Sequence, residues 1–104
     1  MSKVVKVAPA SEITPKQAKI IEVDGAQIAV FNVDGSFFAI NNVCPHRGGP
    51  LGEGDVEGTV VTCPWHGWQF DVKTGQNPVN PAAKVKTFAC KVEGPDVCVE
   101  VMDA

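Results

Sequence analysis

The sequence has very little histidine and no tyrosine, with only two histidines and four cysteines among 104 residues. Apolar runs are also short: the longest, 28–31 and 37–40, have four residues each, whereas a membrane span needs about twenty. Nine basic side chains against twelve acidic ones leave no basic surface for nucleic acid or anionic lipid. These scarcities argue against a membrane or nucleic-acid partner. A site that used both histidines would leave none for a second.

The overall composition is that of one globular domain spanning 1–104. Apolar residues make up 44% and charged residues 20%, which is typical of a chain that folds around a single core. The first residues include lysines but no apolar stretch of signal-peptide length. We therefore expect a cytoplasmic protein with reduced thiols, in which four unevenly spaced cysteines indicate metal binding before disulfides.

The turn signals predict an all-β fold of short antiparallel strands, arranged as a sandwich or barrel. Asp-Gly pairs at 24–25 and 34–35 stand between apolar runs and predict hairpins. No stretch keeps helical spacing for ten residues. We expect strands at 3–7, 17–23, 26–33, 36–41, 58–63, 68–72, 84–92 and 97–102.

Two segments interrupt this strand pattern and are expected to be loops. Residues 42–57 are rich in glycine, and residues 76–82 (Gln-Asn-Pro-Val-Asn-Pro-Ala) are stiffened by proline. Long loops on a rigid β scaffold often carry function.

Both histidines of the chain lie in two matched peptides. The first contains Cys44 and His46 with one residue between them, and the second contains Cys63 and His66 with two between them. One cysteine or histidine alone would be interpreted as a buried core residue, but four in matched clusters indicate a metal site. Two thiolates and two imidazoles suit a tetrahedral zinc ion or a two-iron cluster in which each loop contributes to both metals.

Cys-x-His, sixteen intervening residues and Cys-x-x-His together resemble the signature of the Rieske [2Fe-2S] proteins. The resemblance extends over 11–101 and is closest to the stand-alone ferredoxins of bacterial ring-hydroxylating dioxygenase systems. It implies that Cys44 and Cys63 bind the inner iron of one [2Fe-2S] cluster, while His46 and His66 bind the outer iron near the surface.

The same resemblance implies an antiparallel β-sandwich that carries a small cluster-binding subdomain at 42–82. Loop 76–82 would correspond to the proline-rich loop that covers the cluster. The implied function is a soluble, monomeric electron carrier that passes single electrons from a flavoprotein reductase to a terminal oxygenase of the aromatic ring-hydroxylating type. The acidic side chains Glu53, Asp55 and Glu57 would suit a reductase with a basic rim.

Three other functions can be compared with the carrier. A Rieske oxygenase adds a mononuclear iron held by two further histidines and a carboxylate, and this chain has no third histidine, so we expect an electron-transfer protein and no enzyme. The small subunit of a nitrite reductase can share the fold and remains the alternative. A structural zinc module without a redox role would be colourless.

Departures from the high-potential Rieske proteins predict a low reduction potential. Those proteins carry a disulfide at the positions of Gly49 and Trp65, and serine and tyrosine hydroxyls at the positions of Trp68 and Phe70. The chain lacks all four groups. Because hydroxyl donors stabilise the reduced cluster, we expect a midpoint of roughly −150 mV, at the low end of the Rieske range.

The two remaining cysteines, Cys90 and Cys98, flank the turn at 94–96. In a hairpin they would lie diagonally and not opposite each other, which is a poor geometry for a disulfide. We expect two free thiols that pack as small apolar groups.

Overall fold

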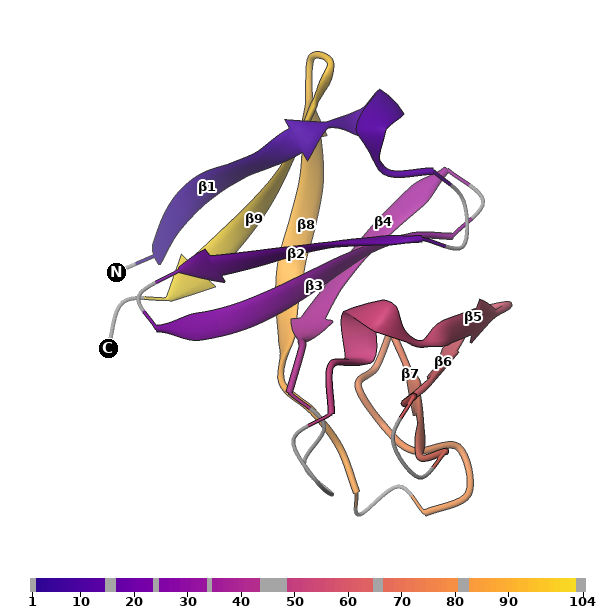
Figure 1. The fold of residues 1–104 in the computed structure, drawn as a ribbon. Coiled ribbons are helices and arrows are strands. Elements are labelled where there is room, and N and C mark those ends of the chain that lie inside the picture. The colour runs from indigo at the N-terminus through magenta and orange to yellow at the C-terminus, as the bar shows by residue number, and fades with distance from the viewer. Residues whose placement is uncertain are drawn as a thin grey trace.

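The computed structural model describes residues 2–14, 17–23, 25–33, 35–43, 49–64, 67–80 and 83–102. Within these ranges the chain forms antiparallel strands and two short 3-10 helices (Figure 1), which confirms the all-β prediction. No helix in the described part is long and apolar enough to cross a membrane. The elements in chain order are β1 (Ser2–Pro9), η1 (Ala10–Glu12), β2 (Ala18–Val23), β3 (Ala26–Val33), β4 (Ser36–Asn41), η2 (Leu51–Glu53), β5 (Asp55–Glu57), β6 (Val60–Thr62), β7 (Gln69–Asp71), β8 (Thr87–Glu93) and β9 (Asp96–Met102).

The six longer strands form one sheet in the order β1-β9-β8-β4-β3-β2. β4 and β8 pair through only two positions, Ala39 with Phe88 and Ile40 with Thr87, and the sheet folds over at this junction. Its two halves enclose a common core, so the predicted antiparallel sandwich is confirmed. That core contains the buried residues Ala8, Ile13, Ile28, Val30, Ala39, Val97, Val99 and Val101.

Both predicted Asp-Gly hairpins are present. β2 pairs with β3 and β3 pairs with β4 in antiparallel register. The glycines of the two turns, Gly25 and Gly35, have φ angles of 82° and 88°. A side chain would be strained in this left-handed region, which explains why glycine stands in both turns.

The three short strands form a second sheet in the order β5-β6-β7. The core beside this sheet and the core of the sandwich lie on opposite faces of β3. Ile28 and Val30 of β3 face the sandwich core, whereas Ala29 and Phe31 pack in a second core. This second core, called here the site core, consists of Ala29, Phe31, Ile40, Leu51, Val56, Val61, Cys63, Phe70, Val72 and Val85. A strand that is apolar on both faces therefore separates two cores.

The prediction of a loop over 42–57 was wrong at its end, because 55–57 form strand β5. Val56 is buried and pairs with Val61, while Asp55 and Glu57 are exposed, which is the polar-apolar-polar alternation of a half-buried strand. Two other expected strands also differ at their starts. Gly58, with φ of 61°, turns the chain before β6, and β8 begins at Thr87.

Candidate metal centre

One of the four predicted ligands, Cys63, lies within the described residues. Cys44, His46 and His66 lie outside them. In the described part of the chain, no three His, Cys, Asp or Glu side chains gather closely enough to hold a metal ion. The ligand set Cys44, His46, Cys63 and His66 therefore stays a prediction, and the described residues show how the loops that carry it begin and end.

Cys63 is held at the base of the second motif. It directly follows β6, is 2% exposed and belongs to the site core. Its backbone N–H donates to the carbonyl of Trp68 over 2.6 Å, which closes the turn between β6 and β7. Gly67 in this turn has φ of 71°, where a side chain would be strained. The two ends of the second motif are thus joined by a backbone hydrogen bond, and its first predicted ligand is shielded from water.

The first motif lies in a segment whose two ends are joined. Val43 and Pro50 form an isolated antiparallel bridge, and the N–H of Leu51 donates to the carbonyl of Asn42 over 2.7 Å. Leu51 is fully buried in the site core together with Cys63. The bases of both motif loops therefore rest on one apolar cluster, although 63 and 44 are far apart in sequence.

The proline-containing loop is organised by Asn77. Its Oδ1 accepts hydrogen bonds from the N–H groups of Val79 and Asn80 over 2.8 and 2.9 Å, and its own N–H donates to the carbonyl of Ala83 over 2.9 Å. Ala83 packs against the site core that contains Cys63. Val79 is 89% exposed, so this ordered loop presents an apolar side chain to solvent.

The two aromatic residues after Gly67 occupy different environments. Phe70 is fully buried and packs in the site core. Trp68 is half-buried, and the two ring centroids lie 6.4 Å apart with an interplanar angle of 33°. Neither residue brings a hydroxyl group to the neighbourhood of Cys63.

Cys90 and Cys98 are free thiols, as predicted. Cys90 pairs with Val99 and Cys98 pairs with Lys91, so the two cysteines are offset by one position and face opposite sides of the sheet. Burial, and then the neighbouring Cys98, raise the pKa of the Cys90 thiol from 9.0 to about 11. Both are therefore poorly suited to bind a metal together.

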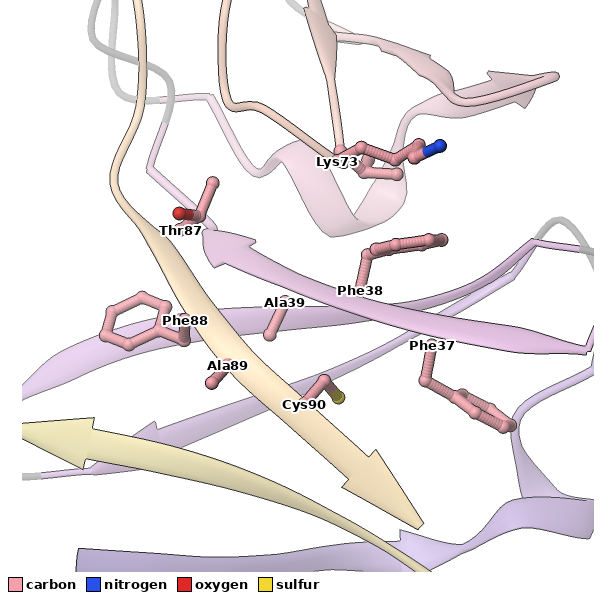
Figure 2. Close-up of a pocket in the computed structure, with 9 residues that line it drawn as sticks. Phe37, Phe38, Ala39, Lys73, Thr87, Phe88, Ala89 and Cys90 are labelled. Atoms are coloured by element: carbon pink, nitrogen blue, oxygen red, sulfur yellow. The ribbon is translucent and has the colours of Figure 1, made fainter. Parts of the chain in front are cut away.

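A cleft of about 390 Å³ opens where β4 and β8 diverge. Figure 2 shows Cys90 on the same side of this cleft as Phe37, with Lys73 and Phe38 on the other. Among the residues that the structure describes, its lining comes from β4, β8 and the turn after β7 and does not include Cys63.

The described part of the site fits a cluster held by thiolates and imidazoles. Cys63 is the kind of soft donor that iron–sulfur clusters use, and its apolar surroundings in the site core keep water away from it. Sequence reasoning missed the contribution of Asn42 and Asn77, whose side chains bond to the backbone of these loops. Asn-Pro at 77–78 is a recognisable turn signal, but nothing near Asn42 in the sequence marks it as buried.

Three comparisons with known proteins agree with this geometry. The Rieske [2Fe-2S] domain family matches residues 3–89. The ferredoxin component of a naphthalene 1,2-dioxygenase system from Pseudomonas aeruginosa is 33% identical over 82 residues, which are 78% of this chain and 79% of that protein. A chain of the complex of reduced oxygenase and oxidized ferredoxin in carbazole 1,9a-dioxygenase superposes with a TM-score of 0.85 at 33% identity, covering 92% of this chain and 91% of its own.

A nitrite reductase small subunit from Mycobacterium tuberculosis, described as putative and NADH-dependent, has a TM-score of 0.92. It covers 100% of this chain and 99% of its own, but the identity is 22%. At this identity the likeness shows a shared fold and carries no argument about function.

Proposed function

Because the chain belongs to the Rieske [2Fe-2S] domain family, we propose that it is the ferredoxin component of an oxygenase system, passing single electrons from a flavoprotein reductase to a terminal oxygenase. The observation that carries the proposal is the position of Cys63, buried in the site core together with Leu51, whose N–H joins the two ends of the first motif loop. Similarity over 78% of the chain to the ferredoxin component of a naphthalene 1,2-dioxygenase system, and over 92% to a chain of the carbazole 1,9a-dioxygenase complex, supports it.

We assign Cys44 and Cys63 to one iron and His46 and His66 to the other. When bound, the cluster supplies a one-electron redox couple. The chain's own residues would hold it and exclude water: Cys63 sits in an apolar core, and the backbone hydrogen bonds at the bases of both loops would limit the movement of the ligands. Small movement on electron transfer favours fast exchange with a partner.

Exposed residues support a transient encounter with two partners. Val79, at 89% exposed, and Val43, at 40%, lie beside the loops that carry the predicted ligands or cover them. Glu53, Asp55 and Glu57 are exposed on η2 and β5. A few apolar contacts suit a small interface below about 1,200 Å², as weak redox encounters have, and the acidic side chains would suit a reductase with a basic rim.

The proposal is tested with purified protein. Iron and acid-labile sulfide should be present in equal amounts, and the reduced protein should give a rhombic paramagnetic signal. A flavin-dependent ferredoxin reductase and a ring-hydroxylating oxygenase should then both exchange electrons with it in stopped-flow experiments. A colourless zinc protein would contradict the cluster, while electron delivery to a sirohaem nitrite reductase but to no oxygenase would replace the proposed partner.

A further inference from the structure

We infer that Asn42 is a positioning residue for the first cluster-binding loop, an inference that rests on the proposed function. Asn42 directly follows β4 and stands two residues before the predicted ligand Cys44. It is 2% exposed, although asparagine is mostly found on protein surfaces. A buried amide that makes several hydrogen bonds at this place acts on the loop that starts there.

Four hydrogen bonds join Asn42 to two separate elements. Its backbone N–H donates to the carbonyl of Gln27 over 2.9 Å, and its Nδ2 donates to Oε1 of the same residue over 3.0 Å. Its carbonyl accepts from the N–H of Leu51, and its Oδ1 accepts from the N–H of Gly52 over 2.6 Å. Asn42 thus ties both ends of the loop over 43–50 to strand β3.

Glycine at position 52 lets this contact form without displacing neighbouring side chains. A Cβ at Gly52 would lie 2.9 Å from Oδ1 of Asn42 and 2.5 Å from Cγ1 of Ile20 on β2. Contacts this close are not tolerated between well-packed atoms. Gly52 therefore lets η2 approach both the amide of Asn42 and the side chain of Ile20, and the return end of the loop is held by two strands.

Asn41, the preceding residue, joins the start of the first motif loop to the segment between the proline-containing loop and β8. The N–H of Asn41 donates to the carbonyl of Lys86 over 2.9 Å, and its Oδ1 accepts from the N–H of Val43 over 2.9 Å. Lys86 follows Val85, which packs in the site core with Cys63. The pair 41–42 therefore fixes the first motif loop relative to the segment that leads into β8.

A second buried asparagine offers a matched control at the other end of β3 and β4. Asn32 is 7% exposed; its Nδ2 donates to the carbonyl of Ile13 over 2.6 Å and its Oδ1 accepts from the N–H of Gly35 over 2.9 Å. Asn32 pairs with Phe37 near the β3–β4 turn, whereas Asn41 at the opposite end pairs with Ile28. The side chains of Asn32 and Asn42 each join separate segments, but only Asn42 borders a motif loop.

The experiment compares Asn42→Ala with Asn32→Ala in the cluster-loaded protein and measures the rate of iron release to a chelator. Asn42→Ala removes two part-buried hydrogen bonds, and loss of the one to Gly52, which holds the return end of the loop, corresponds to about a tenfold change in an opening equilibrium. We expect iron release about tenfold faster in Asn42→Ala and within about twofold of wild type in Asn32→Ala, with a broadened paramagnetic signal in the first variant alone. In the same loaded protein, the amide of Gly52 should exchange with deuterium about tenfold faster in Asn42→Ala.

Variants of two exposed glutamines test the same inference if Asn42→Ala or Asn32→Ala does not fold. Gln27→Ala removes the acceptor for Nδ2 of Asn42, and Gln17→Ala removes an equally exposed glutamine near Asn32, hydrogen-bonded to Thr14. We expect faster iron release in the first of these alone. Equal release rates within each pair would overturn the inference. Absence of iron and sulfide from the wild type would instead overturn the proposed function, so the two failures are distinguishable.

Discussion

Phe70→Tyr would add a hydroxyl group to the core that contains Cys63, and its effects on the midpoint potential and on the free energy of unfolding can be predicted. Phe70 is fully buried in the site core, and its neighbours there are almost all hydrocarbon. Trp68 has an indole N–H, which only donates. Among the described members of this core, the sulfur of Cys63 is the only side-chain acceptor that a new hydroxyl could use.

The midpoint potential and the free energy of unfolding of Phe70→Tyr therefore distinguish two positions of the new hydroxyl group. A hydroxyl that donates to the sulfur is favoured more when the cluster is reduced, by about 1 kcal/mol, the difference between neutral and charged acceptors. This corresponds to a midpoint potential higher by about 40 mV for a one-electron couple. A hydroxyl without an acceptor leaves the potential unchanged and lowers the free energy of unfolding by about 1–3 kcal/mol.

The assay combines a redox titration with urea unfolding of the loaded protein, and Phe38→Tyr provides a control. Phe38 is half-buried and packs against the same core, but it lies on β4 and outside both motifs. We expect a higher midpoint in Phe70→Tyr with nearly unchanged stability, and no change of midpoint in Phe38→Tyr. An unchanged midpoint together with a large loss of stability would refute the link between missing hydroxyls and a low potential.

Three further predictions concern ligands, docking and pH. His46→Ala or His66→Ala should abolish the normal cluster spectrum, because each removes an imidazole ligand; an unaltered spectrum in either variant would contradict the ligand assignment. Val79→Asp charges a side chain that is 89% exposed, and we expect several-fold slower electron delivery to the oxygenase at an unchanged midpoint, measured by stopped flow; equal rates would argue against this loop as a contact. The pKa of Cys90 is raised from 9.0 to about 11, so the fold favours the neutral thiol. The stability that the neutral Cys90 thiol contributes should be complete below pH 9.0 and lost as the pH rises to about 11. The free energies of unfolding of wild type and Cys90→Ala, measured with urea over this range, should therefore converge, and parallel curves would show that the shift is absent.

The fold could be predicted to the extent that local signals determine it. Asp-Gly pairs next to apolar runs specify the β2–β3 and β3–β4 hairpins, and the doubly apolar run 28–31 specifies a strand between two cores. β5 was missed because three residues between glycines give a very short alternation. Val56 forms a strand through its pairing with Val61 and its burial in the site core, which depend on residues that follow later in the chain.

The candidate site, like the fold, has a part that local sequence signals predict and a part that depends on distant residues. Histidine and cysteine spacing predicts a metal site because few other arrangements use all four groups, and the burial of Cys63 agrees with this prediction. The two consecutive asparagines at 41–42 look like an ordinary turn in the sequence. Their buried hydrogen bonds depend on Gln27 and Gly52, and no local pattern specifies which distant backbone an amide will meet.

The use of hydrogen bonds at the neck of the first loop follows from what a redox site needs. Leu51 and Ile20 pack against this neck, and apolar packing holds a segment in place without fixing its direction. Ligands of a metal cluster must stay within about 0.5 Å of their places, and hydrogen bonds add the directional restraint because they weaken steeply when misaligned. Apolar residues at 42 and 27 could fill the same space without keeping the loop in one orientation. A buried amide that spans β3 and η2 supplies that restraint where the chain leaves the sandwich for its predicted ligands.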